Sequence, residues 1–258
     1  MSPVLAFGDD RSEEANRCWS WIQSQRWDGW RLEIVTAEPH PDMAPIDPEE
    51  AELHPWEPDA PRTPGDSGFV DVEYLHAEMD PRVALISRSW DLVAIGPRGQ
   101  GILKGLHLGS TADWLLREPT SPLVVARQPE PVRSVLFAAD GSAHAQRALG
   151  TLMKLSWVAE MKVRVVTVED GQADTAVAQR EATSTLSEAG AEVEGEVLRG
   201  NPRKAILDEI EKVAPDMVVM GARGLKGVKR LVVGSTTAAV ARSTDRTLLI
   251  AHAEAEQL

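Results

Sequence analysis

Two stretches of this sequence align with each other without a gap: DLVAIGPRGQGILKGLHLGSTADWLLREPTSPLVVAR (residues 91–127) and DMVVMGARGLKGVKRLVVGSTTAAVARSTDRTLLIAH (residues 216–252). The shift between them is 125 residues throughout, and roughly a third of the aligned positions are identical. Similarity at one fixed spacing indicates a repeated structural unit. The chain is therefore expected to hold two copies of one domain.

The similarity extends upstream of both stretches. DPRVALI, from Asp80, matches NPRKAIL, from Asn201, and VLAFGDD, from Val4, matches VLFAADG, from Val135. The repeat thus includes the beginning as well as the end of each copy.

A linker is expected between the copies. Near RQPEPVR (residues 127–133), two prolines and several charged or polar side chains interrupt the periodic pattern. We predict one domain over residues 1–129 and a second over residues 130–258.

Each copy alternates short apolar runs with longer stretches of helical periodicity. In the second copy the predicted strands are the runs SVLFAAD, KVRVVTV, EVEGEVL, DMVVMG and TLLIAH. The predicted helices lie between them, at residues 142–158, 175–189, 202–213 and 235–243. Strands that are apolar throughout suit a parallel sheet covered by helices on both faces. The pattern predicts an α/β fold of two doubly wound, five-stranded parallel-sheet domains in tandem, each Rossmann-like.

The first copy departs from the second in one segment. It keeps five strands, VLAFG, LEIVTA, VDVEYLH, DLVAIG and PLVVAR, but residues 38–68 stand where the second copy has its second helix. This segment holds eight prolines and nine acidic residues, a composition that disfavours both helix and sheet. We expect a solvated surface loop, with a docking segment for a basic partner or a lid over a pocket as the alternatives. One face of the first sheet must then be covered in another way.

The composition is that of a water-soluble chain of 258 residues, 43% of them hydrophobic, with a net charge of −13. Most of the negative charge lies in the first copy. An acidic chain with no long apolar run argues against a nucleic-acid or membrane surface. The single cysteine, Cys18, forms no internal disulfide, and the first residues lack the pattern of a signal peptide. A cytoplasmic protein is expected.

Tryptophan is unusually frequent, with eight residues against one tyrosine and three phenylalanines. Trp19, Trp21, Trp27 and Trp30 crowd the first predicted helix and the turn after it. This spacing favours a core or a domain interface, and stacking of Trp19 on an adenine is the alternative.

The same glycine pattern follows the fourth strand of both copies: GxxG, nine residues, then GST. Its members are Gly221, Arg223, Gly224, Gly234, Ser235 and Thr236 in the second copy and Gly96, Arg98, Gly99, Gly109, Ser110 and Thr111 in the first. The first two glycines allow a sharp turn at the end of a strand, and the third begins a helix whose N-terminus attracts anions. Open parallel sheets bind ligands at that edge. Each copy is therefore predicted to hold a phosphate group.

The basic residues of this pattern leave two interpretations open. Arg98 and Arg223 either neutralise phosphate or form surface ion pairs. Lys104 and Lys229 occupy matching positions in the spacer, where a solvated side chain is the plainer interpretation.

Several classes of site are excluded by spacing. No lysine follows a glycine as in a Walker A loop, and GxGxxG is absent after the first strand. The six histidines show no repeated ligand spacing, so no protein metal site is expected. A nucleophilic triad or a base placed to activate water is likewise missing from the repeat, which argues for binding rather than catalysis.

The pattern resembles the universal stress protein family, in its ATP-binding branch, over essentially the whole chain. The residues that carry the resemblance are Asp140, Gly141 and Ser142 after the first strand of copy two, with Gly221, Gly224, Gly234 and Ser235. The resemblance implies the sheet of adenine nucleotide alpha hydrolase-like proteins, with ribose near the acid after strand one and phosphates on the glycines. It also implies that the two domains pair through their last strands about a pseudo-two-fold axis.

The resemblance implies particular nucleotide-binding residues. In the second copy they are Ala138, Asp140, Val168, Met220, Gly221, Arg223, Gly224, Gly234, Ser235, Thr236 and Thr237. In the first copy they are Gly8, Asp9, Thr36, Ile95, Gly96, Arg98, Gly99, Gly109, Ser110 and Thr111. Copy one reads Gly-Asp-Asp-Arg-Ser after its first strand, so the ribose acid is Asp9 or Asp10, and Thr36 stands where Val168 stands.

The sequence therefore predicts an adenine-nucleotide sensor. The expected ligand is ATP, with AMP or ADP as alternatives, and Mg²⁺ arrives only as carried by the nucleotide. Slow ATP hydrolysis, an enzyme that uses ATP to activate a substrate, and a nucleotide-free interaction module with degenerate sites are the rival interpretations. An unidentified protein partner and a homodimer are further expectations.

Overall fold

The computed structural model describes residues 2–38, 51–99, 108–118, 121–169, 175–224 and 233–253. The first half contains strands β1 (Val4–Gly8), β2 (Arg31–Ala37), β3 (His54–Pro55), β4 (Asp71–Ala77), β5 (Leu92–Ile95) and β6 (Leu123–Val125). The second half contains β7 (Ser134–Ala138), β8 (Lys162–Glu169), β9 (Glu192–Arg199), β10 (Met217–Gly221) and β11 (Thr247–Ala251).

All of these strands form one sheet, in the order β3-β4-β2-β1-β5-β6-β11-β10-β7-β8-β9. Neighbours within each half are parallel, except that the two-residue strand β3 runs antiparallel to β4. The halves join where β6 pairs antiparallel with β11, with Val124 opposite Leu249. From that junction outward, both halves place their strands in the same order. The predicted α/β architecture with five parallel strands in each half is confirmed.

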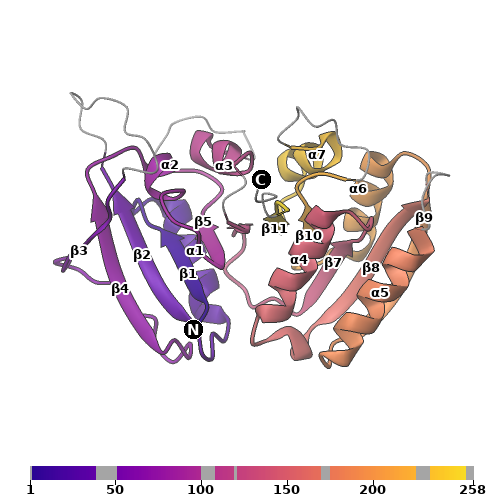
Figure 1. Cartoon of the computed structure of the whole chain (residues 1–258), viewed down its shortest axis with the longest axis horizontal. Helices are drawn as coiled ribbons and strands as arrows, with labels where there is room; N and C mark the ends of the chain where they lie inside the picture. The colour runs from indigo at the N-terminus through magenta and orange to yellow at the C-terminus, as the bar shows by residue number, and fades with distance from the viewer. Residues whose placement is uncertain are drawn as a thin grey trace, which may run out of the picture.

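The helices lie on both faces of the sheet (Figure 1). Those of the first half are α1 (Glu13–Ser24), α2 (Pro81–Ala84) and α3 (Ser110–Leu115). Those of the second half are α4 (Ala143–Lys154), a 3-10 turn (Val158–Glu160), α5 (Thr175–Glu188), α6 (Pro202–Val213) and α7 (Ser235–Ser243). Helices α3 and α7 lie next to each other between the two halves in Figure 1.

Equivalent caps begin the first helix of each half. The hydroxyl of Ser12 accepts the amide of Ala15, and the hydroxyl of Ser142 accepts the amide of Ala145. Each cap fixes the point at which the chain leaves its first strand and enters the helix, so the two turns at the sheet edge are built alike.

The two halves cover one face of the sheet differently. In the second half α5 packs on β8 and β9 and buries Ala182 and Leu186. In the first half Arg62 and Phe69 lie on that face, whereas Leu53 packs on the opposite face. Trp27 stacks on Phe69 with ring centroids 5.6 Å apart. The described part of the proline-rich segment, residues 51–69, is mostly exposed, as expected for a surface loop, and contacts such as that of Trp27 with Phe69 and the burial of Leu53 and Ser67 anchor it on the first half.

A cluster of tryptophans joins the halves at the amino ends of the strands. Trp27 contacts Trp21, Trp30 and Trp157 edge-on, with centroids 5.5–6.3 Å apart. The indole of Trp30 donates to the carbonyl of Lys154 at 3.2 Å. The tryptophans therefore fill the core and the junction between halves, as one of the two interpretations predicts, while Trp19 packs on Phe7 inside the first half.

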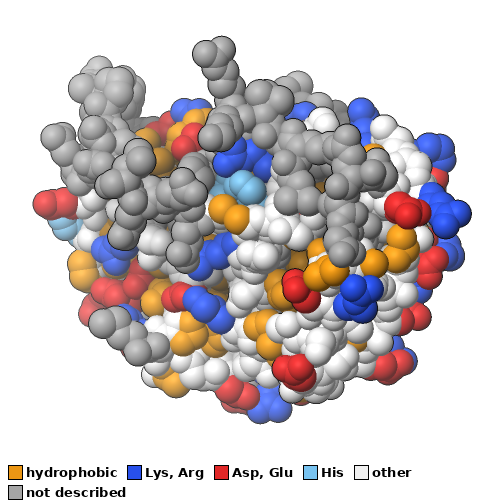
Figure 2. Space-filling view, turned by 45° about the vertical axis from the view of Figure 1, so that its right-hand side comes forward, with side chains coloured by type: hydrophobic (Ala, Val, Ile, Leu, Met, Phe, Trp, Pro, Cys, Tyr) orange, Lys and Arg blue, Asp and Glu red, His pale blue; other side chains and the backbone are white. Residues whose placement is uncertain are grey.

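The surface mixes charges of both signs. Figure 2 shows basic and acidic side chains interspersed over the visible face, although the net charge is −13. None of the helices in the described ranges is both long and apolar enough to cross a lipid bilayer.

Candidate functional site

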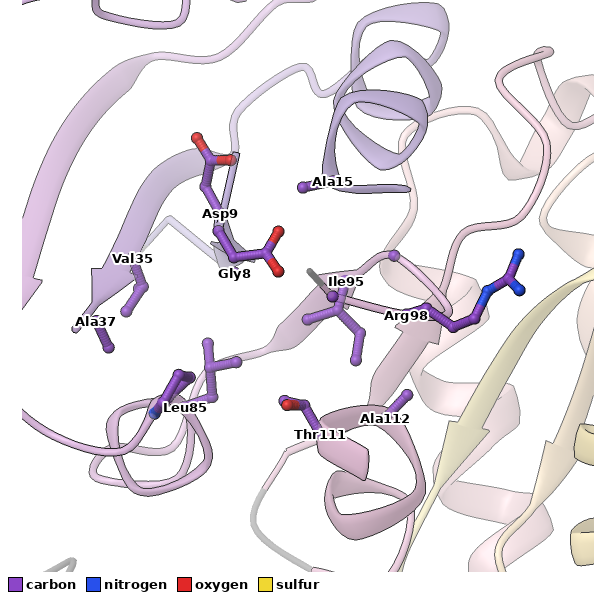
Figure 3. Close-up of a pocket in the computed structure, with 14 residues that line it drawn as sticks. Gly8, Asp9, Ala15, Val35, Ala37, Leu85, Ile95, Arg98, Thr111 and Ala112 are labelled. Atoms are coloured by element: carbon purple, nitrogen blue, oxygen red, sulfur yellow. The ribbon is translucent and has the colours of Figure 1, made fainter. Parts of the chain in front are cut away.

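A pocket opens at the carboxyl ends of β1, β2 and β5 in the first half (Figure 3). It holds about 580 Å³ of empty space, part of it open to solvent. Its lining consists of Gly8, Asp9, Asp10, Ala15, Val35, Ala37, Pro81, Leu85, Ile95, Gly96, Arg98, Gly99, Thr111 and Ala112. Seven predicted residues are among them, namely Gly8, Asp9, Ile95, Gly96, Arg98, Gly99 and Thr111. The predicted residues Thr36, Gly109 and Ser110 are outside this lining.

The first glycine of each pattern lets a strand end approach a helix closely. A Cβ on Gly96 would stand 2.6 Å from the carbonyl oxygen of Glu14, and one on Gly221 would stand 2.6 Å from the amide nitrogen of Ala145. Both distances are too short for any side chain. The glycines are therefore required so that β5 and β10 can pass beside the starts of α1 and α4.

The second glycine faces a carboxylate. A Cβ on Gly99 would stand 2.6 Å from Oδ2 of Asp10, and one on Gly224 would stand 2.6 Å from Oδ2 of Asp140. Each half therefore brings one carboxylate against its GxxG turn, from the loop that follows the first strand. The sequence predicted that these two segments share a site, and in both halves they touch.

The third glycine closes the turn and begins a helix. The amide of Gly109 donates to Pro97 at 2.7 Å, and the amide of Gly234 donates to Ala222 at 2.8 Å. Gly109 and Gly234 are the N-caps of α3 and α7, and neither supplies a side chain to bond the first helical amides. The nine-residue spacers, with Lys104 and Lys229, lie largely outside the described residues.

The hydroxyls at the start of α7 differ in their availability. Ser235 is exposed and Thr236 is half-buried. Thr237 is buried, and its hydroxyl donates to the carbonyl of Gly221 at 2.8 Å. Thr237 therefore braces the helix against the strand end.

Of the two acids that the sequence offers in the first half, Asp10 is the one that corresponds to Asp140. Asp10 accepts the amide of Ser12 at 3.0 Å, as Asp140 accepts that of Ser142 at 3.0 Å. Asp9 corresponds to Ala139, since their amides bond equivalent carbonyls of the neighbouring strand. Figure 3 shows the Asp9 carboxylate directed away from the middle of the pocket.

A correction concerns Thr36. Gly8 pairs with Val35, and Ala138 pairs with Val166. Two residues further along each strand come Ala37 and Val168, so Ala37 rather than Thr36 is the counterpart of Val168. Successive side chains of a strand point to opposite faces of the sheet. The side chain of Thr36 therefore lies on the face away from the pocket, where its hydroxyl contacts Nδ1 of His76 at 3.0 Å. The two halves differ by one residue in the separation of their first two strands, which is why the sequence alone points to Thr36.

The arginine of each GxxG turn is paired within the protein. Arg98 donates to Glu14 at 2.7 Å, and Figure 3 shows its guanidinium pointing out of the pocket. Arg223 donates to Nε2 of His144 at 3.1 Å. Both contacts use the second residue of the neighbouring helix. Arg98 thus forms the ion pair of one interpretation, whereas Arg223 forms a hydrogen bond with a histidine.

His144 is offered two N–H donors. Besides Arg223, the amide of Ala253 lies 2.7 Å from its Nδ1. A neutral imidazole accepts at one nitrogen only, so one of these bonds forms in a given tautomer and neither forms after protonation. Burial and the charge of Arg223 lower the pKa of His144. The ring centroids of His144 and His252 lie 5.8 Å apart. Burial also lowers the pKa of His252.

Among the residues that the structure describes, no group of three or more His, Cys, Asp or Glu side chains is arranged to hold a metal ion. Polar groups of this site are carboxylates, hydroxyls and backbone amides. Such a set suits the ribose and phosphates of a nucleotide, with any cation entering as the partner of the phosphates.

The fold and site define a doubly wound α/β protein whose ligand edge is framed by glycines at strand ends and by a helix N-terminus. Residues 131–252 match the model of the universal stress protein family. The second half of the chain is therefore a domain of that family.

Two curated relatives illustrate the match. Universal stress protein Slr1230 of Synechocystis sp. is 37% identical over 160 residues, which are 60% of this chain and 55% of that protein. Universal stress protein Rv1996 of Mycobacterium tuberculosis is 36% identical over 83 residues, 30% of this chain and 26% of that protein. The aligned part of this chain thus spans about half or less of the length of these relatives.

One solved structure matches over nearly the full length. The universal stress protein from Archaeoglobus fulgidus DSM 4304 has a TM-score of 0.68 and 21% identity, covering 98% of this chain and 97% of its own. This likeness shows that the arrangement of both halves is a known fold.

Proposed function

We propose that the chain binds an adenine nucleotide, ATP in the first place and AMP or ADP as alternatives, at the carboxyl edge of each half. One observation carries the proposal: in both halves a carboxylate, Asp10 or Asp140, lies against a GxxG turn next to the start of a helix that no side chain caps. Ribose hydroxyls, a polyphosphate and a helix N-terminus are complementary in charge and hydrogen bonding.

Different residues of such a site would contact the ribose, the base and the phosphates of the nucleotide. Asp140 accepts hydrogen bonds from ribose hydroxyls, and Val168 with Met220 forms the apolar wall for the base. The amides of Ser235 and Thr236 then face the phosphates. In the first half Asp10 and Ala37 take the roles of Asp140 and Val168. Mg²⁺ bound to the triphosphate would supply charge neutralisation.

The proposed activity is that of a sensor in the stress response rather than a fast catalyst. The described site residues bind and orient a nucleotide, and the carboxylate that each half brings to the turn is already engaged by a backbone amide. A nucleotide held in this way changes the order of the edge at which it binds, and hence the surface offered to a protein partner. An unidentified partner, a homodimer, a cytoplasmic location and a domain boundary at residues 129/130 belong to the same proposal.

Thermal unfolding with ATP, AMP, cyclic AMP and NAD tests the proposal. A ligand that binds only the native state raises the melting temperature of the protein once the ligand concentration exceeds its Kd. The matched variants are Gly99→Ala and Gly224→Ala, which push the carboxylates of Asp10 and Asp140 aside. Gly150→Ala is the control, because a Cβ on Gly150 meets nothing within 4 Å.

An ATP-dependent shift in the parent protein and in Gly150→Ala, reduced in each site variant and abolished when both are combined, supports the proposal. No shift with any of the four nucleotides favours the nucleotide-free interaction module instead. Turnover of ATP at the rate of an ordinary enzyme contradicts the sensor.

A further inference from the structure

Asp9 and Arg62 form a bidentate ion pair next to the first site. Nε of Arg62 lies 2.6 Å from Oδ2 of Asp9, and its Nη2 lies 2.7 Å from Oδ1. The Asp9 side chain is fully buried and the Arg62 side chain is 9% exposed. A charge-assisted bidentate pair of this kind is among the strongest polar contacts in proteins.

The same carboxylate also holds the turn that leads to α1. Oδ1 of Asp9 accepts the amide of Arg11 at 3.0 Å, and Nε of Arg11 lies 3.1 Å from Oδ2. Arg11 has a φ of 59°, a conformation that L residues adopt reluctantly. Asp10, the acid of the proposed ribose contact, is the residue between them. The position of Asp10 therefore depends on how Asp9 and Arg11 are held.

The contacts of Asp9 with Arg62 and Arg11 form a clamp that holds the turn before α1. The corresponding turn of the second half has its conformation without such a clamp. This turn carries Gly141 at a φ of 77°, which glycine adopts freely. Ala139 stands where Asp9 stands and offers no carboxylate. Helix α5 covers this face of the second half, whereas in the first half Arg62 comes from the proline-rich segment. Among the described residues, this clamp is therefore found at the first site and not at the second.

Arg62 is in turn anchored on all sides. Its guanidinium lies 5.5 Å from the ring centroid of Phe7 and 5.6 Å from that of Trp19, and it donates to Asn16 at 2.9 Å. Its carbonyl accepts the hydroxyl of Tyr74. Any displacement of residues 51–69 must therefore move the partner of Asp9.

We propose that Arg62 is a positioning residue of the first nucleotide site. Through Asp9 it holds residues 9–12 so that Asp10 faces the ligand, and it makes binding at the first site conditional on the seating of residues 51–69. The second site is independent of this clamp. The proposal rests on the proposed nucleotide binding and adds a difference between the two sites.

Calorimetric titration with ATP tests the role of Arg62 in two variants that each keep one intact site. In Gly224→Ala the second site is impaired and the first is measured, and in Gly99→Ala the first site is impaired and the second is measured. Arg62→Ala is expected to weaken binding at the first site about tenfold or more and to leave the second unchanged. Arg26→Ala removes an arginine of the same half that is 66% exposed and is the control.

A triple variant separates positioning from packing. Asp9→Ala, Arg11→Gly and Arg62→Ala together give the first half the turn of the second. Recovery of affinity to within about threefold of the parent supports the proposal, since the clamp is then unnecessary. Loss of affinity in both Arg62→Ala and the triple variant overturns it, because Arg62 would then act only through its packing on Phe7 and Trp19.

Two other outcomes also contradict the proposal, and they distinguish its failure from that of the proposed function. If Arg62→Ala binds ATP at the first site as the parent does, or if only the second site binds ATP in the parent, the positioning role falls while nucleotide binding stands. If neither Gly224→Ala nor Gly99→Ala binds ATP, both fall.

Discussion

Asp10 and Asp140 occupy equivalent places in the two halves: each accepts the amide of the serine two residues further on at 3.0 Å. Each also stands 2.6 Å from the point where its GxxG turn would carry a Cβ, on Gly99 or Gly224. The two halves therefore share one site design, and it includes the carboxylate as well as the glycines.

Replacing these acids tests their proposed role. Asp10→Asn and Asp140→Asn are expected to weaken ATP binding at their own site about tenfold, because a hydrogen bond to a charged acceptor is replaced by one to a neutral acceptor. Calorimetric titration of the single variants and of their combination measures this. Equal affinities for parent and double variant would rule out a ribose contact by these carboxylates.

The register of β2 gives a paired prediction for the wall of the first site. Ala37→Leu is expected to fill the pocket and abolish ATP binding there, because Ala37 lines it. Thr36→Val changes the neighbouring residue, which faces the other side of the sheet, and should leave affinity unchanged. Binding lost in Thr36→Val but kept in Ala37→Leu would show that the register is wrong.

The junction between halves depends on a half-buried arginine. Arg127 follows β6 and donates to the carbonyls of Ala241, at 2.6 Å, and Thr244 at the end of α7. Burial lowers the pKa of Arg127 to about 10. Arg127→Ala removes these donors from buried carbonyls and is expected to lower the free energy of unfolding by about 1–3 kcal/mol.

Urea denaturation measures the effect, with Lys162→Ala as control. Lys162 forms an exposed ion pair with Glu192, and its loss should change stability by less than about 0.5 kcal/mol. If both variants are equally stable, Arg127 does not anchor the junction.

Two histidines near the junction predict a loss of stability in mild acid. The pKa of His144 and that of His252 are lowered from the usual value of 6.5, chiefly by burial, so the unfolded chain binds protons that the native chain does not. Stability is therefore fully present above pH 6.5 and falls as the pH decreases through that value, by at most about 1.4 kcal/mol per pH unit for each histidine.

The measurement is the urea midpoint as a function of pH, in the parent and in the double variant His144→Gln with His252→Gln. The variant should lose the dependence between about pH 5 and 7, while both proteins weaken further below about pH 4. The loss of stability below about pH 4 comes from carboxylates such as Asp91 and Asp113. The pKa values of these two groups are lowered by hydrogen bonds and ion pairs with basic side chains. An unchanged slope in the variant would assign the mild-acid loss to other groups.

Local signals in the sequence were sufficient for much of the fold. Helices α6 and α7 begin and end at the predicted residues, because Pro202 and Gly234 mark their starts. The duplicated glycine pattern located both strand ends. The helix predicted over residues 142–158 ends earlier, at Lys154, where the chain turns toward Trp157 at the junction.

What escaped prediction depends on contacts between distant residues. The pairing of Asp9 with Arg62 spans 53 positions, and no local pattern announces it. The sequence points to Thr36 rather than Ala37 because the two halves differ by one residue in the spacing of β1 and β2, which only the strand register reveals. The contacts that anchor residues 51–69 escaped for the same reason, since the composition indicates a solvated loop, which these mostly exposed residues form, but not the partners of Arg62.

The central claim is that the two glycine-framed edges bind adenine nucleotide, and the number of ATP molecules bound per chain tests it most directly. Nucleotide is first removed from the protein by unfolding and refolding, and ATP is then titrated while the mass of the intact complex is measured. Complexes with one and then two ATP per chain are expected, with the second lost in Gly99→Ala and in Gly224→Ala. A chain that stays free of ATP at millimolar ligand, or that keeps both ATP molecules in the combined variant, would contradict it.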